Sequence, residues 1–123
     1  MSAPKPVIDP GVIANLRTLN SSDGDDFLRE IVGLFSADMP VRLADLDRSL
    51  ATGDAPTFRR AAHSIKGSAA SLGAKTLRGM AEEIETRAHA GGLAGLAPLV
   101  AALRVEFAAV KVALENIVRH PPA

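Results

Sequence analysis

The residues best suited to take part in chemistry are His63 and the two that follow it one helical turn later, Lys66 and Gly67. An imidazole can act as a nucleophile, a proton carrier or a metal ligand. Apolar residues recur through the same segment, and at about 100° per residue they fall within one arc that excludes His63. They are Phe58, Ala61, Ala62, Ile65, Ala69 and Leu72. His63 is therefore predicted to lie on the outer half of a helix, where a partner can reach it.

Three cations and two small residues surround His63 at helical spacing. They are Arg59, Arg60, Lys66, Gly67 and Ala70. Such cations commonly form a solvated face, but around an exposed imidazole they favour a dianionic phosphoryl group on the ring. A glycine inside a helix costs about 1 kcal/mol relative to alanine, and here the small residues leave space for a molecule that approaches the imidazole. The pattern indicates a surface histidine suited to phosphorylation.

Other histidine chemistries fit this segment less well. Ser64 follows His63 directly, but adjacent helical positions point about 100° apart, so the two are poorly placed as a nucleophile and its base. A metal site needs several convergent ligands, and the positions three and four residues after His63 hold a lysine and a glycine instead. We therefore expect neither a metal site nor an enzyme active site in this chain.

Composition narrows the classes of partner. The 123 residues include 14 basic and 14 acidic side chains, and there is no cysteine, tryptophan or tyrosine. A neutral chain without aromatic stacking platforms is atypical of nucleic-acid binding. No apolar run approaches the roughly 18 residues of a membrane span, and residues 1–6 hold no apolar signal region. We expect a cytoplasmic protein that binds neither nucleic acid nor membrane.

Helical spacing of apolar residues runs through nearly the whole chain, and no strand-like alternation of any length occurs. Asp9 and Pro10 form a capping residue and a first-turn proline, which start a short helix that reaches about residue 20. Four longer helices follow, at about 23–52, 55–72, 75–90 and 93–118. The sequence therefore predicts an all-α fold, an antiparallel four-helix bundle with an additional short N-terminal helix covering one end.

The domain is predicted to span residues 9–118, between a flexible N-terminal tail at 1–8 and a C-terminal tail at 119–123. The second helix keeps the phase of its apolar face across Pro40, so we expect one long helix bent there. The residues expected to point inward from it are Phe27, Leu28, Ile31, Leu34, Phe35, Met39, Leu43, Leu46 and Leu50.

Residues 61–74, with the sequence AAHSIKGSAASLGA, resemble the signature of histidine phosphotransfer (HPt) domains of bacterial two-component phosphorelays. The likeness extends over about residues 9–118. It implies a signal-transduction phosphoprotein in which His63 accepts a phosphoryl group from the aspartate of a receiver domain and passes it to another receiver. The partners implied are response-regulator receiver domains, a hybrid histidine kinase, or both. The protein would be a phosphocarrier rather than an enzyme, with no cofactor of its own and Mg²⁺ supplied by the receiver.

The resemblance also implies a role for Glu85, which lies 22 residues after His63, where the family often carries Gln or Glu. There the side chain accepts a hydrogen bond from the imidazole Nδ1, which fixes the tautomer and leaves Nε2 as the nucleophile. Glu82, one helical turn earlier, is the alternative residue for this contact. Without the contact, Glu85 would be an ordinary exposed carboxylate.

Two other functions stay open on the sequence alone. One is an HPt-like domain that a histidine kinase phosphorylates directly in trans, and the other is a helical adaptor that accepts no phosphate. We expect a monomer, because a neutral chain with an exposed site suits one. The Met1 tail and the Pro121-Pro122 end favour a free-standing protein over a domain excised from a hybrid kinase. The sequence does not identify the donor and acceptor receivers, the direction of phosphate flow or the residues that decide docking specificity.

Overall fold

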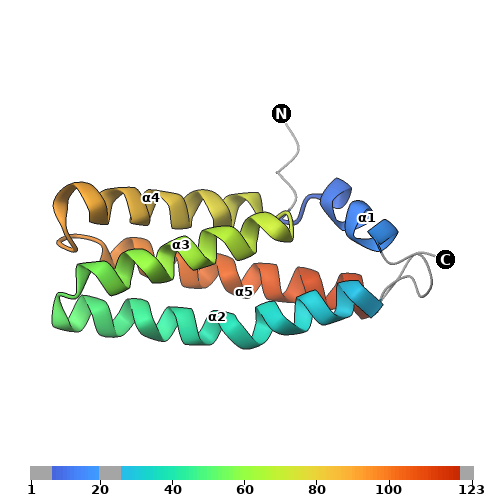
Figure 1. Cartoon of the computed structure of the whole chain (residues 1–123), viewed down its shortest axis with the longest axis horizontal. Helices are drawn as coiled ribbons and strands as arrows, with labels where there is room; N and C mark the ends of the chain where they lie inside the picture. The colour runs from blue at the N-terminus through green and yellow to red at the C-terminus, as the bar shows by residue number, and fades with distance from the viewer. Residues whose placement is uncertain (1–6, 20–25, 120–123) are drawn as a thin grey trace.

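The helices of this protein lie side by side in one bundle. The structure, a computed structural model, describes residues 7–19 and 26–119. Within them lie α1 (Pro10–Leu19), α2 (Asp26–Thr52), α3 (Ala55–Ser71), α4 (Lys75–Gly91) and α5 (Ala97–Arg119). The four long helices run antiparallel, and α1 lies at one end (Figure 1). α3 packs between α2 and α4, while α5 packs against α4 and α2. The predicted all-α bundle is confirmed.

The interior is a single cluster of aliphatic side chains with very few aromatic ones. The rings of Phe35 and Phe107 lie with their centroids 5.6 Å apart and join α2 to α5. The arc of α3 predicted to face inward is buried, including Phe58, Ile65 and Leu72. Because that face of α3 is fixed in the core, the opposite face must be presented to solvent.

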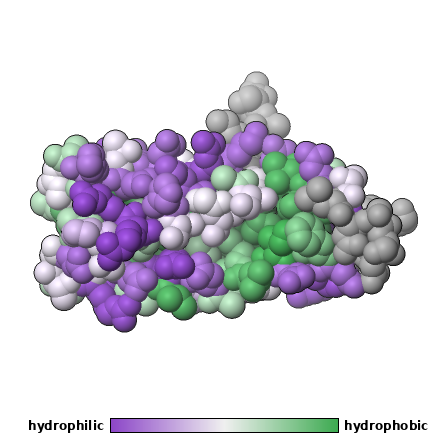
Figure 2. All heavy atoms as spheres, viewed as in Figure 1, coloured by the Kyte–Doolittle hydropathy of each residue, from purple (hydrophilic) through white to green (hydrophobic). Residues whose placement is uncertain are grey.

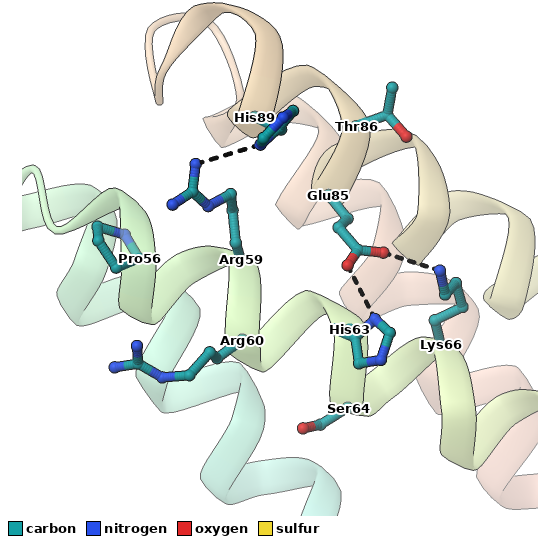
Figure 3. A pocket seen from close by; sticks show the side chains of 9 residues that line it. All are labelled: Pro56, Arg59, Arg60, His63, Ser64, Lys66, Glu85, Thr86 and His89. Carbon is teal, nitrogen blue, oxygen red and sulfur yellow. Dashed lines mark hydrogen bonds and ion pairs between the residues drawn. The ribbon is translucent and has the colours of Figure 1, made fainter.

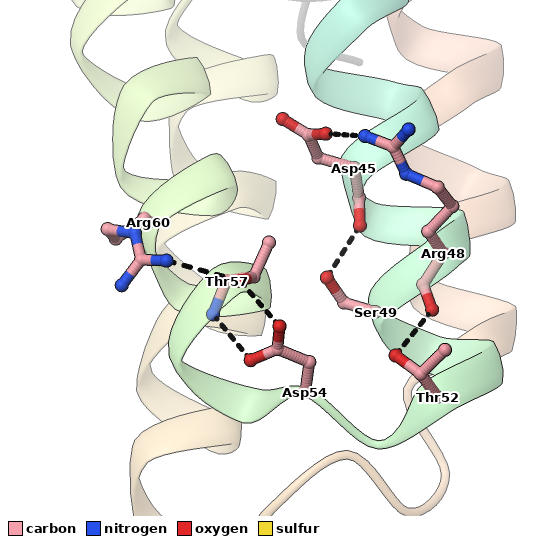
Figure 4. Close-up of polar contacts among 7 residues, drawn as sticks. All are labelled: Asp45, Arg48, Ser49, Thr52, Asp54, Thr57 and Arg60. Atoms are coloured by element: carbon pink, nitrogen blue, oxygen red, sulfur yellow. Dashed lines mark hydrogen bonds and ion pairs between the residues drawn. The ribbon is translucent and has the colours of Figure 1, made fainter.

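Two glycines set the limits of α3. Gly53 (φ 75°) and Gly73 (φ 76°) adopt the left-handed backbone that glycine tolerates best. The Asp54 carboxylate caps the helix by accepting hydrogen bonds from the Thr57 N–H (3.2 Å) and hydroxyl (2.7 Å), as Figure 4 shows. These bonds, with that from the Thr57 hydroxyl the larger cause, hold the pKa of Asp54 below its ordinary value. The cap and the C-terminal turn agree with the predicted bounds.

The segment before α1 is fastened to the turn between α3 and α4. The Asp9 N–H donates to the Gly73 carbonyl (2.8 Å), and the Asp9 carboxylate pairs with Lys75 at 3.0 Å. Ile8 is only 6% exposed and joins the core. The predicted N-terminal tail is therefore wrong at Ile8, because these contacts hold the chain against the bundle. Residues 1–6 lie outside the described residues.

The structure corrects three further expectations. α5 begins at Ala97 rather than at residue 93, because Gly92 and Gly95 have positive φ and interrupt the helix. Leu34 does not point inward but is 64% exposed, and Val32 is buried instead. Leu34 lies about 100° around the helix from the buried Phe35, outside the arc that faces the core. α2 continues through Pro40 as one helix. The C-terminal tail predicted at 119–123 is wrong at Arg119, which is the last residue of α5. Residues 120–123 and the connection expected at 20–24 lie outside the described residues.

Candidate functional site

His63 lies in the middle of α3, and its side chain is 68% exposed. α4 packs alongside α3, so residues of α4 reach the imidazole from one side. The Nδ1 atom of His63 lies 2.9 Å from Oε2 of Glu85, and Nζ of Lys66 lies 2.9 Å from the other carboxylate oxygen, Oε1 (Figure 3). The contact expected between His63 and Glu85 is present, and Glu85 rather than Glu82 makes it.

The Glu85 carboxylate stays ionised at neutral pH. Partial burial is the largest single influence and raises its pKa, but hydrogen bonds from Lys66 and His63, together with their charges, outweigh it. The net result is a pKa of Glu85 below its ordinary value of 4.5. An ionised carboxylate only accepts hydrogen bonds, so Nδ1 of His63 must carry the proton in this contact. In the neutral ring, Nε2 then holds a free lone pair.

The three cations predicted around the imidazole each have another partner. Lys66 pairs with Glu85, as described above, and Arg60 donates to the hydroxyl of Thr57 at 3.1 Å. Arg59 makes a long contact of 3.4 Å with Nδ1 of His89 on α4. In this arrangement the cations lie around the site without contacting the ring. Their role in balancing a phosphoryl charge stays a prediction.

These side chains line one open hollow of about 770 Å³ between α3 and α4. The residues that line it are Pro56, Arg59, Arg60, His63, Ser64, Lys66, Glu85, Thr86 and His89. Gly67 and Ala70 lie outside this hollow, on the exposed face of α3. A Cβ atom at Gly67 would meet nothing within 4 Å. Open surface therefore continues past His63 towards the end of α3.

The sequence reasoning did not place four of the lining residues at the site, namely Pro56, Ser64, Thr86 and His89, and of these His89 makes a contact across the hollow. The signal that could have identified it is its spacing of four residues after Glu85, which places both side chains on the same face of α4. His89 and Glu85 thus make parallel contacts to Arg59 and His63, which are themselves four residues apart on α3. Among residues 7–19 and 26–119, no cluster of His, Asp and Glu is suited to hold a metal ion.

A second, apolar hollow of about 370 Å³ lies between α2 and α3. Its lining residues are Ile31, Leu34, Phe35, Asp38, Ser68, Ser71 and Leu72. Ser71 stands one turn after Gly67 on α3, so this hollow continues the open surface that begins at His63. Figure 2 shows apolar surface gathered near this end of the bundle, in contrast to the polar surface elsewhere on the same face.

Comparison with known proteins agrees with this geometry. The family model of the Hpt domain matches residues 30–116. The structure of histidine-containing phosphotransfer protein B (HptB) from Pseudomonas aeruginosa is similar with a TM-score of 0.84 and 30% identity, covering 94% of this chain and 97% of that chain. The HPT domain of an Hpt sensor hybrid histidine kinase from Shewanella has the same fold, with a TM-score of 0.74, 17% identity and coverage of 95% and 97%. Comparison with curated proteins gave no match.

The fold and the exposed histidine define a helical phosphotransfer module. The chain belongs to the Hpt domain family, and its role is in phosphotransfer. No helix in the described part of the chain has the length and apolar character needed to cross a membrane.

Proposed function

We propose that this protein is a phosphorelay intermediate that accepts a phosphoryl group on Nε2 of His63 from a receiver-domain aspartate and passes it to a second receiver. One observation carries the proposal. Glu85 holds the Nδ1 side of an imidazole that is otherwise open to solvent, so the nucleophilic nitrogen faces outward. The apolar hollow between α2 and α3 offers a docking area beside it.

In the first transfer, the lone pair of Nε2 attacks phosphorus in line with the bond to the aspartyl oxygen. The N–P bond forms as the P–O bond breaks, and the electron pair leaves on the receiver's carboxylate. The Nδ1 proton stays in its hydrogen bond with Glu85, which offsets the positive charge that develops on the ring. Transfer to the second receiver reverses these bond changes. Mg²⁺ bound in the receiver supplies charge neutralisation, so this chain acts as a phosphocarrier rather than an enzyme.

The basic residues contribute to this scheme in different ways. Lys66 fixes Glu85 and brings a positive charge to the edge of the site. Arg59 contacts His89, and Arg60 donates to the Thr57 hydroxyl and also interacts with the Asp54 carboxylate. Both bring positive charge that helps to balance the phosphoryl group as it crosses. Gly67 and Ala70 permit close approach of the receiver.

The test is transfer of ³²P from a phosphorylated receiver with Mg²⁺ to the wild type, to His63→Gln and to His89→Gln. His89 is a matched control because it is a second histidine in the same hollow. We expect label that is stable in alkali and lost in acid on the wild type and on His89→Gln, and none on His63→Gln. If receivers from the source genome neither donate label nor remove it, the relay proposal fails. Label from a histidine kinase and ATP without any receiver would favour direct phosphorylation instead.

A further inference from the structure

Arg59 differs from the other cations of the hollow at His63 in the kind of group that it contacts. Lys66 pairs with a carboxylate of α4, and Arg60 interacts with the carboxylate that caps α3. Arg59 instead lies 3.4 Å from Nδ1 of His89. Because a guanidinium can only donate hydrogen bonds, this ring nitrogen must be the unprotonated acceptor. The positive charge of Arg59 is therefore held by a neutral group and is not offset by an anion.

The residues around Arg59 offer it no carboxylate. Side chains three and four residues away share its face of α3, and these positions hold Ala55, Pro56, Ala62 and His63. Across the hollow, both oxygens of the Glu85 carboxylate are already used by His63 and Lys66. Among residues 7–19 and 26–119, Arg59 thus has no acidic partner, and a carboxylate of another molecule can bind it.

His89 holds the Arg59 side chain in one direction. Figure 3 shows Arg59 extending from α3 towards His89 on α4, so that the contact bridges the hollow. An unrestrained arginine loses much of its conformational freedom when it binds a partner, and a contact formed beforehand reduces that loss. His89 is therefore placed to act on a partner through Arg59, without touching the partner itself.

The pair of Arg59 and His89 lies one helical turn from the relay histidine. Arg59 precedes His63 by four residues and His89 follows Glu85 by four, which is about 6 Å along each helix. A receiver that brings its aspartyl phosphate to Nε2 of His63 therefore extends over Arg59. The receiver also holds Mg²⁺, whose protein ligands include carboxylates, so its surface near the reacting aspartate is acidic. Opposite charges then face each other beside the reacting groups.

We propose that Arg59, positioned by His89, binds an acidic side chain of the docked receiver next to the aspartyl phosphate. The assignment rests on the relay function proposed above and adds to it a contact that selects among receivers. A receiver with a carboxylate at this point docks more tightly than one with a neutral side chain, and a basic side chain there is repelled.

Rates of phosphoryl transfer over a range of concentrations of a phosphorylated receiver, with Mg²⁺ present, test the contact. We expect Arg59→Ala to raise KM by about fivefold, the upper range for an exposed ion pair. Arg59→Glu should raise KM further, because two carboxylates would then face each other. Arg87→Ala is the matched control, since it removes an exposed arginine of α4 that lies outside the hollow, and its KM should equal that of the wild type.

The positioning role of His89 is tested in the same assay. His89→Ala should raise KM by about twofold to fivefold and leave kcat unchanged, whereas His89→Gln should stay near the wild type because its amide oxygen can accept from Arg59. The double variant of Arg59→Ala with His89→Ala should be no weaker than Arg59→Ala alone, because His89 acts only through Arg59. Phosphorylation of His63 by phosphoramidate, which needs no docking, should be equal in the wild type and His89→Ala.

The possible failures can be told apart. Transfer with the same KM in the wild type, Arg59→Ala and His89→Ala overturns the contact and leaves the relay intact. An Arg59→Glu variant no worse than Arg59→Ala overturns the acidic nature of the partner group. Slower phosphoramidate labelling of His89→Ala would place the effect at His63 and contradict a docking role. If no receiver transfers to the wild type, the relay itself fails and this contact fails with it.

Discussion

At the scale of single residues, Glu85 acts as a junction that uses each carboxylate oxygen once. Oε2 accepts from His63 and Oε1 pairs with Lys66. A glutamine at this position could accept from the imidazole only by turning its amide N–H groups toward the Lys66 ammonium, so that donors would face donors. The choice of a carboxylate at position 85 is therefore linked to the lysine at position 66.

Replacing Glu85 should disturb the tautomer of His63. In Glu85→Ala nothing holds the Nδ1 proton, so we expect ¹⁵N NMR of the imidazole to show a mixture of the two neutral tautomers. Transfer from a phosphorylated receiver should slow by about tenfold, the lower end for groups that orient a histidine. Glu82→Ala is the control and should change neither quantity. An unchanged tautomer ratio in Glu85→Ala would show that the contact does not orient the ring.

The lowered pKa of Glu85 gives its contribution to stability a defined pH dependence. A carboxylate whose pKa is lower in the folded state stabilises the protein above its unfolded pKa, near 4.5, and loses that effect as pH falls through the folded value. We expect the unfolding free energies of wild type and Glu85→Gln to differ by no more than about 1 kcal/mol at pH 7. The difference should persist to about pH 5 and shrink below it. Urea titrations at several pH values measure this difference in unfolding free energy. If the difference disappears between pH 7 and pH 5, its pH dependence comes from a group other than Glu85.

At the scale of elements, α3 depends on glycine in two opposite ways. Gly67 lies inside the helix with open space around it, whereas Gly73 has a φ of +76° and its added Cβ would lie 2.9 Å from Cβ of Val12. One glycine keeps the helix surface uncrowded, and the other allows the turn into α4 to lie against α1.

The same substitution should therefore have opposite effects at these two positions. Gly67→Ala should stabilise the protein by about 1 kcal/mol, because alanine favours a helix interior. Gly73→Ala should destabilise it by about 1–2 kcal/mol from the left-handed backbone alone, and the contact with Val12 adds to this cost. Denaturant unfolding measures both. Effects of the same sign would mean that the backbone at Gly73 differs from the one described.

The elements also show what spacing in the sequence can and cannot predict. Apolar periodicity located all five helices, and the caps at Asp9 and Asp54 located two of their starts. Periodicity did not predict that Leu34 is exposed while Phe35 is buried, because the width of the buried arc depends on how closely α3 and α5 approach α2. It placed the start of α5 too early because Leu96 is buried although it precedes the helix. The position of Glu85 followed from a family resemblance, whereas the contact between His89 and Arg59 required the packing of α3 against α4.

At the scale of the whole molecule, the two long sides of the bundle have different surfaces. The side of α3 combines the charged hollow at His63 with the apolar hollow at Leu34, and the side of α5 is uncharged along its outer face. Because these surfaces lie on different sides, changes to one should leave the other intact.

Leu34 provides a test of the docking area on the side of α3. Leu34→Ser removes exposed apolar surface without opening the core, so we expect the free energy of unfolding to change by less than about 0.5 kcal/mol. Transfer from a receiver should weaken through a higher KM, while phosphorylation of His63 by a small phosphodonor such as phosphoramidate should be unchanged. Val112→Ser, on the opposite side, is the control. Equal loss with both donors would place the effect at His63 rather than at docking.

The exposure of His63 has a consequence for signal timing. Its Nε2 faces open solvent from a regular helix, and the side chains around the ring are held by one another rather than arranged to position an attacking water. The proposed phosphoimidazole would therefore decay at a rate close to that of the same group in free solution. The duration of the signal would then be set by the abundance and encounter rate of the receivers, and this molecule would act as a passive store between them.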